Sequence, residues 1–348
     1  MSEEFREILK ARARGPKHLG PLDPGLCERA MALILAGEAT PAQIGGFLLV
    51  GRAAGDNAAE LAAYARAMRS FVREIEVPPG PPVVTVAGGF DGKTGTLNVG
   101  AAASLVAAAA GGRVLMIGCE GTPPKHGRTV FDTLRRLGLP APQPLKEAED
   151  SLAERGFAAT SVDHYLPELH ALLVLRREMA RRTSLNVVEK LVSPIAGSRF
   201  LVGVSHRPFL RTVPEVLAKL GVEHAVVAQA IEGSDEAPLD GSSSLVRLRA
   251  GGCEELRVSP ESLGLPRTTR AHIPWKGEAD ESRAVLDALE GGQGPVRNLL
   301  VYNAALRLWT ADGSAPLQEH AEKACSVLDS GEALEFLARL RRPATVCR

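Results

Sequence analysis

A glycine-rich segment is the first place in this chain where the residue types indicate a particular chemistry. Four glycines, Gly88, Gly89, Gly92 and Gly95, follow the apolar run 83–86 and precede an alanine-rich run. Glycines between a strand and a helix let backbone N–H groups approach an anion closely, and the start of the helix favours negative charge. The segment therefore predicts a phosphate-binding loop. A connection without a ligand is the weaker alternative, because a turn needs fewer glycines.

Two common nucleotide-binding motifs are similar to this segment without matching it. Residues 87–94 follow A-x-x-x-x-G-K-T, so Lys93 and Thr94 are in place but the first glycine of a Walker A loop is missing. The G-x-G-x-x-G spacing of a dinucleotide-binding loop is absent as well. A nucleotidase that binds ATP through Lys93 is therefore the lowest-ranked hypothesis.

Two adjacent carboxylates form a second candidate site. Asp235 and Glu236 follow the apolar stretch AVVAQAI at 225–231. Such a pair can bind one hard cation between itself and a diphosphate. Taken alone, a solvated acidic loop is the better interpretation, so a metal site needs support from elsewhere in the chain.

Basic residues cluster locally although the chain as a whole is neutral. It has 41 Lys and Arg against 41 Asp and Glu, which excludes an overall basic nucleic-acid-binding protein but not a local patch. The densest cluster lies at 176–182. A basic loop contains Lys125, His126 and Arg128. Contact with phosphate and a solvated turn are equally good interpretations of this loop. Without stacking aromatics, these clusters indicate contact with phosphate alone. Smaller clusters are Lys10, Arg12, Arg14 and Lys17, and Arg135 with Arg136.

The predicted secondary structure changes at a proline-rich linker, residues 78–82, from helices alone to alternating strands and helices. Residues 1–77 predict a small all-helical domain, and the segment at about 163–185 is expected to pack on it. Residues 83–348 alternate apolar strands with helices, which predicts an α/β domain with a mainly parallel sheet flanked by helices. The expected strands lie at 83–86, 113–117, 201–204, 225–229, 244–249 and 254–258, and C-terminal helices at 279–290, 295–311 and 314–328.

Composition places the chain among ordinary globular proteins. Apolar residues make up 45% and charged residues 24%. The five cysteines are scattered and lack a C-x-x-C pair, which argues against a disulfide framework and a cysteine zinc site. The charged start has no apolar signal core, and no apolar run reaches the length of a membrane span, so we expect a cytoplasmic protein.

The glycine-rich segment and its surroundings resemble anthranilate phosphoribosyltransferase. That family carries a V-G-T-G-G-D-G-x-G-T-F-N-I-S-T loop, onto which residues 86–101 can be laid with one extra residue, Thr94. The helical stretch 35–69 and the R-R-E run beginning at Arg176 are also similar, and the resemblance spans roughly residues 20–340. Matching positions are Gly89, Asp91, Gly92, Gly95, Thr96, Asn98, 220–223, 233–236 and 303–305.

The resemblance implies a fold of the nucleoside phosphorylase/phosphoribosyltransferase type and a function in tryptophan biosynthesis. The implied reaction moves the phosphoribosyl group of phosphoribosyl pyrophosphate (PRPP) to an aromatic amine or a nucleobase-like acceptor and releases pyrophosphate. In the family, the pair that matches Asp235 and Glu236 carries Mg²⁺, and the protein is a homodimer. The substrate-binding residues implied here are Gly88, Gly89, Asp91, Gly92, Lys93, Thr96, Asn98, Lys125, His170 and Arg176.

The chain departs from the family at this site. Phe90 replaces a loop glycine, Gly100 replaces the serine that begins the next helix, and Glu120 stands where the family has an arginine. His170 stands where the family's F-H-P-A-M-R run ends in an arginine, and histidine is only partly charged near pH 7. Such losses resemble TrpD-like paralogues that keep the fold without obvious transferase motifs. The alternative hypothesis is therefore a non-catalytic paralogue that binds nucleic acid through basic groove residues.

Overall fold

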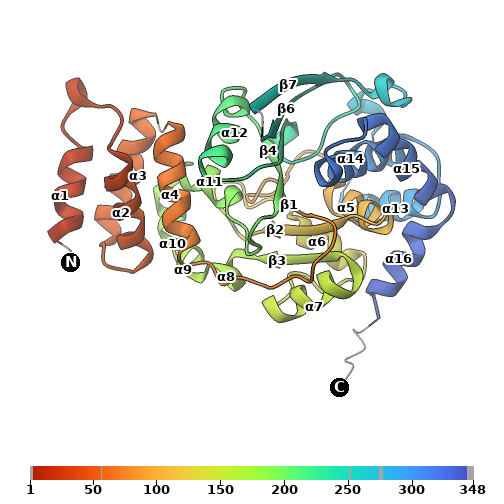
Figure 1. Cartoon of the computed structure of the whole chain (residues 1–348), viewed down its shortest axis with the longest axis horizontal. Coiled ribbons are helices and arrows are strands. Elements are labelled where there is room, and N and C mark those ends of the chain that lie inside the picture. The colour runs from red at the N-terminus through yellow and green to blue at the C-terminus, as the bar shows by residue number, and fades with distance from the viewer. Residues whose placement is uncertain (1–2, 56, 251, 274–276, 343–348) are drawn as a thin grey trace.

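The N-terminal part of the chain folds into a bundle of helices, red to orange in Figure 1. The computed structural model describes residues 3–55, 57–250, 252–273 and 277–342. The bundle consists of α1 (Glu3–Arg12), α2 (Pro24–Leu35), α3 (Pro41–Ala54) and α4 (Ala58–Arg69). The last three begin at Asp23, Thr40 and Asn57, whose side chains accept first-turn N–H groups. Helix α1 is not among the predicted helices.

A run of short helices occupies the middle of the chain, and two of them contact this bundle. The run consists of α8 (Val162–Tyr165), α9 (Pro167–His170), α10 (Leu173–Met179) and α11 (Leu185–Val188). Helix α10 contacts α3, and α11 contacts α4. One apolar cluster includes Phe47 of the bundle, Leu185 of α11 and Val202 of the sheet, so the segment joins the bundle to the larger domain. The domain boundaries 1–77 and 83–348 stay predictions.

A sheet forms the centre of the larger domain. Its strands in the described residues are β1 (Val83–Ala87), β2 (Arg113–Gly118), β3 (Phe157–Ser161), β4 (Arg199–Val204), β5 (Ala225–Gln229), β6 (Ser243–Arg249) and β7 (Gly252–Val258). They lie in the order β3-β2-β1-β4-β5-β6-β7, parallel up to β5 and antiparallel beyond it. The predicted α/β class with a mainly parallel sheet is confirmed. Strand β3 was not expected, because its sequence FAATS includes polar residues.

Helices cover both faces of the sheet (Figure 1). In β2, Val114 and Met116 join one apolar cluster and Leu115 and Ile117 the other, because successive side chains of a strand alternate. The described cysteines form no disulfide, and Cys347 lies outside the described residues. No described helix is long and apolar enough to cross a membrane. The remaining α-helices are α5 (Gly100–Ala109), α6 (Val130–Arg136), α7 (Leu145–Arg155), α12 (Phe209–Lys219), α13 (Glu278–Leu289), α14 (Pro295–Asp312), α15 (Leu317–Asp329) and α16 (Glu332–Leu340).

The strand order reverses between β1 and β4, since β2 and β3 lie on one side and β5 on the other. Ligands of α/β sheets bind beyond the carboxyl ends of the strands at such a point. The connections after β1, β4 and β5 meet here. The connection after β5 crosses close to β4 at Gly203. A Cβ at this position would lie 1.9 Å from Ser234 O, so the close crossing requires glycine.

Alanine at position 203 is expected to push the loop that carries Asp235 away from β4. We expect Gly203→Ala to lower the free energy of unfolding by about 1–3 kcal/mol, the usual cost of overpacking, as measured by urea unfolding. Gly241→Ala is the matched control, because a Cβ there meets nothing within 4 Å. Equal stability of the two variants would contradict the close crossing.

Candidate functional site

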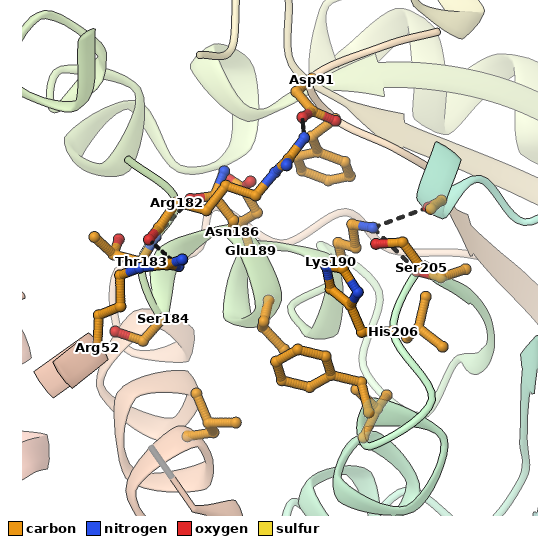
Figure 2. Close-up of a pocket in the computed structure, with 18 of the residues that line it drawn as sticks. Arg52, Asp91, Arg182, Thr183, Ser184, Asn186, Glu189, Lys190, Ser205 and His206 are labelled. Atoms are coloured by element: carbon orange, nitrogen blue, oxygen red, sulfur yellow. Dashed lines mark hydrogen bonds and ion pairs between the residues drawn. The ribbon is translucent and has the colours of Figure 1, made fainter. Parts of the chain in front are cut away.

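A cavity of about 710 Å³ lies at this meeting point, between the helical bundle and the sheet. Figure 2 shows Arg52 of α3, Asp91 of the glycine-rich loop and His206 after β4 among the residues around it. Phe90 and Phe209 add apolar surface to the lining. The cavity can therefore accept both an aromatic ring and charged groups.

The glycine-rich loop is held against the basic stretch 125–128 by backbone hydrogen bonds. Lys93 N donates to Arg128 O, and Arg128 N donates to Lys93 O, each at 2.9 Å. Gly92 has a φ of +74°, and a Cβ there would lie 2.3 Å from Gly127 C, so only glycine fits. The structure therefore brings the basic stretch next to the predicted phosphate loop.

Donors from the loop and the basic stretch converge on the carboxylate of Glu232. Thr94 N donates to it at 2.9 Å, and Gly95 N at 3.2 Å. Thr96 Oγ1 donates at 2.8 Å, and Lys125 Nζ lies 3.4 Å from the same carboxylate. We call these four donors the anion seat. Glu232 has a left-handed φ of 56°, which is unfavourable for a residue with a Cβ. The loop is thus a built oxyanion site, filled by a carboxylate of the chain itself.

The predicted metal pair, Asp235 and Glu236, is buried, and each carboxylate has a cationic partner. Arg307 of α14 forms an ion pair with Asp235. Lys93 Nζ lies 2.5 Å from Glu236 Oε2, and Gly100 N at the start of α5 donates to Glu236 Oε1 at 2.9 Å. Burial raises the pKa of Glu236, and the ammonium of Lys93 opposes that rise. The sequence predicts Lys93 as a substrate-binding residue and Glu236 as a metal ligand, and in the structure the two form an ion pair with each other.

Asp91 connects the loop to the segment between α10 and α11. Its carboxylate forms an ion pair with Arg182, drawn in Figure 2, and lies 3.8 Å from Lys125 Nζ. Arg52 of the bundle donates to Arg182 O at 2.6 Å. Polar contacts thus link the bundle, the intervening segment and the loop at the edge of the cavity.

Other predicted loop residues make contacts within the chain. Gly88 passes so close to the next connection that a Cβ there would lie 2.5 Å from Asp235 Oδ1. A Cβ on Gly89 would lie 3.5 Å from Glu232 O. Asn98 is buried, and its side-chain amide donates to Thr129 O at 3.0 Å. These positions hold the loop close to its neighbours.

Of the predicted substrate-binding residues, Asp91 alone is among the described residues that line the cavity, and Arg176 and His170 are outside that lining. Arg176 is 3% exposed, and its guanidinium donates twice to Glu189, at 2.7 and 3.0 Å. His170 lies at the end of α9 and is half-buried. Burial lowers the pKa of Arg176, but the charges of Glu189 and of Asp91 help to outweigh that effect, so Arg176 lies within electrostatic reach of the glycine-rich loop.

The departures from the family pattern also have defined surroundings. Phe90 is buried in the apolar cluster that includes the bundle, and it lines the cavity. A Cβ on Gly100 would lie 3.0 Å from Glu236 Oε1, so glycine leaves room for that carboxylate. Glu120 lies 2.6 Å from Arg135 at the surface, so its charge is compensated there.

Several residues of the site were not predicted from the sequence. Lys190 Nζ donates to Gly203 O at 3.0 Å and Gly233 O at 3.1 Å, and burial lowers its pKa. For Arg307 a signal exists, because a charge within the apolar stretch 299–309 needs a buried partner. No local sequence pattern indicates which groups Arg182, Lys190 and Glu232 contact. The added residues are Arg182, Lys190, Glu232 and Arg307.

Several arginines of the basic clusters are neutralised by carboxylates of the chain, whereas Arg177 and Arg181 are exposed. Arg12 and Arg176 form buried ion pairs, and Arg135 and Arg136 form pairs near the surface. Arg182 is paired as well. Arginines with carboxylate partners do not offer the continuous positive surface that a nucleic-acid backbone needs. The geometry therefore does not support the nucleic-acid alternative.

Both parts of the chain match known families. The family model "Glycosyl transferase family, helical bundle domain" covers residues 6–72, and "Glycosyl transferase family, a/b domain" covers residues 81–334. Anthranilate phosphoribosyltransferase of Novosphingobium aromaticivorans is 35% identical over 92% of this chain and 96% of the relative. The chain belongs to the anthranilate phosphoribosyltransferase family. The Rhodospirillum rubrum member is 34% identical over 92% of this chain and 91% of that relative.

Solved structures of the family share the fold. Anthranilate phosphoribosyltransferase from Thermus thermophilus is 27% identical, covers 98% of each chain and has a TM-score of 0.82. The Saccharomyces cerevisiae structure in complex with PRPP and Mg has a TM-score of 0.83 over 97% of each chain, and its 17% identity shows the fold alone. Family membership confirms the predicted fold and the expectation of a glycosyltransferase enzyme. The paralogous branch stays a prediction.

The anion seat makes the stability of the protein depend on pH through Glu232. Partial burial raises the pKa of this carboxyl, but hydrogen bonds from Thr94, Thr96 and Gly95 and the charge of Lys125 outweigh it and lower the pKa to about 2. A lowered pKa stabilises the fold above the unfolded value of about 4.5, and this contribution is lost as pH falls toward 2.

We therefore expect Glu232→Gln to be less stable than the wild type at pH 7 and the difference to shrink steadily below about pH 4.5. Urea unfolding at pH 7, 5, 4 and 3 measures it. Glu154→Gln, at an exposed position, serves as the control. A difference between Glu232→Gln and wild type that stays constant over this range would contradict the expected linkage.

Proposed function

We propose that this member of the family transfers the phosphoribosyl group of PRPP to an aromatic amine and releases pyrophosphate. The observation that carries the proposal is the anion seat. Its donors at the carboxyl end of β1 already hold a carboxylate, and the same donors suit a diphosphate oxygen. Mg²⁺ belongs to the proposal as the counter-ion of the diphosphate, as the yeast structure with PRPP and Mg suggests. From the family relationship we also expect a cytoplasmic homodimer in tryptophan biosynthesis.

The chain's own residues suit the leaving group of this reaction. As the bond between ribose C1 and the diphosphate oxygen breaks, negative charge builds up on the diphosphate. The N–H groups of Thr94 and Gly95, the hydroxyl of Thr96 and the ammonium of Lys125 can stabilise that charge. Glu232 has to leave the anion seat first, and if its backbone changes at the same time, relief of the unfavourable φ of 56° offsets part of the free-energy cost.

The acceptor is proposed to lie in the cavity beside the anion seat. Phe209, which is partly exposed, provides apolar surface for an aromatic ring with the buried Phe90 in the same lining, and Arg52 and Lys190 provide positive charge. Because Arg176 is bound to Glu189, an acidic substituent on the ring would meet Arg52 and Lys190 instead. An anthranilate-like amine suits this lining, and its nitrogen can attack C1 without a strong base. The yeast relative was also solved with 4-fluoroanthranilate.

Incubation with PRPP, Mg²⁺ and anthranilate tests the transfer. We expect release of pyrophosphate and loss of anthranilate fluorescence, each dependent on both substrates. Lys125→Ala is expected to lower kcat by about a hundredfold, the usual effect of removing one group that stabilises developing negative charge. Lys146→Ala, on the exposed face of α7, should keep the wild-type rate. Absence of pyrophosphate release with anthranilate and with a panel of other aromatic amines would overturn the proposed function.

If the diphosphate binds in the anion seat, it competes with Glu232 for the same donors. Glu232→Gln removes the charge that holds this side chain in place. Inorganic pyrophosphate is therefore expected to bind about tenfold more tightly to the variant, equal to about 1.4 kcal/mol. Titration calorimetry measures the change, again with Glu154→Gln as the control. Unchanged or weaker binding would place the diphosphate elsewhere.

A further inference from the structure

The carboxylates of Asp235 and Glu236 already have the contacts that a bound cation would make. Asp235 Oδ2 pairs with Arg307. Glu236 Oε1 accepts a backbone N–H, and Glu236 Oε2 lies 2.5 Å from Lys93 Nζ. Mg²⁺ needs near-octahedral oxygen ligands, and no group of three or more His, Cys, Asp and Glu side chains that could hold a metal occurs in the described ranges. As it stands, the pair does not fit a divalent cation.

Both cations are also fixed by neutral partners. Arg307 is wholly buried, and it donates to Ser104 Oγ at 2.7 Å and to Asn303 O at 2.8 Å. Lys93 Nζ donates to Leu97 O at 2.6 Å. Arg307 therefore has more neutral partners than Lys93, whose ammonium has Leu97 O beside its carboxylate. The two cations are therefore part of the architecture of the site.

The charges of this cluster balance in a buried place. Two carboxylates face one guanidinium and one ammonium, and none of the four side chains is more than 7% exposed. Uncompensated charge in the interior costs several kcal/mol, so a divalent cation that displaced one of the two monovalent cations would still leave one excess positive charge, which an incoming anion would have to balance. Lys93 is the one that can be displaced, because Lys93 and Glu236 line a second cavity of about 430 Å³. That cavity also gives a metal ion access to the pair.

We propose that Lys93 and Arg307 neutralise Asp235 and Glu236 in place of a divalent cation, with the Lys93 ammonium in the metal position. The pair then binds no Mg²⁺ of its own, and Mg²⁺ that accompanies PRPP is held by diphosphate oxygens and water. Lys93 is a positioning residue, since it ties the loop to the start of α5 through Glu236 before a ligand arrives. The inference rests on the proposed function only for the identity of the ligand.

Binding of Mn²⁺ alone to the full chain tests the proposal, because the paramagnetic resonance signal of free Mn²⁺ reports the bound fraction. The test uses wild type, Lys93→Met, the double variant Lys93→Met/Glu236→Gln, and Lys146→Met as surface control. We expect Lys93→Met to bind Mn²⁺ about tenfold more tightly than wild type, because a carboxylate oxygen is freed and a repelling charge removed. The double variant should lose this gain. Mn²⁺ should raise the Tm of Lys93→Met alone.

The outcomes separate this inference from the transfer reaction, since no PRPP is present. A folded Lys93→Met that binds Mn²⁺ no more tightly than wild type overturns the proposal. If Lys93→Met does not fold, wild type and Glu236→Gln decide the matter. Equal Mn²⁺ affinity of these two supports the proposal, and a loss of about tenfold or more in Glu236→Gln overturns it, because that loss identifies a carboxylate metal site.

Discussion

Compensation of buried charge is the constraint on which the rest of the site depends. Glu232, Asp235 and Glu236 lie on one connection after β5, and each meets a positive or donating group from another element. An unpaired buried carboxylate destabilises a fold strongly, so the glycine-rich loop, α5 and α14 must all be in place around this connection. Electrostatics and apolar packing therefore specify the same arrangement.

Close backbone approaches make this pairing possible. At Gly203 the connection crosses β4, at Gly92 and Gly127 two loops touch, and at Gly100 a carboxylate meets the first turn of α5. At these places a Cβ would separate the partners by tenths of an ångström or more. Glycines near the site therefore serve to bring charged groups within hydrogen-bond distance, in addition to exposing backbone donors.

Sequence patterns predict the features of this structure that depend on residues close together in the chain, and they miss contacts between residues far apart in the chain. The strands β1, β2, β4 and β5 are mainly apolar runs, and the caps at Asp23 and Thr40 are short-range signals, so both are predictable. The glycine-rich loop is predictable as an anion site for the same reason. The identity of the anion is not, because Glu232 lies more than 130 residues away in sequence from Thr94. The ion pairs of Lys93 and Arg307 likewise depend on the folded sheet.

The left-handed backbone of Glu232 has a kinetic consequence. If the diphosphate binds in the anion seat as proposed, it can enter only after the Glu232 side chain has left, so association has two steps. At high ligand concentration the observed rate then stops rising and approaches the rate of carboxylate release. That rate would depend on how far the backbone of Glu232 changes with its side chain, because only a change of backbone relieves the unfavourable φ of 56° and offsets the loss of the hydrogen bonds.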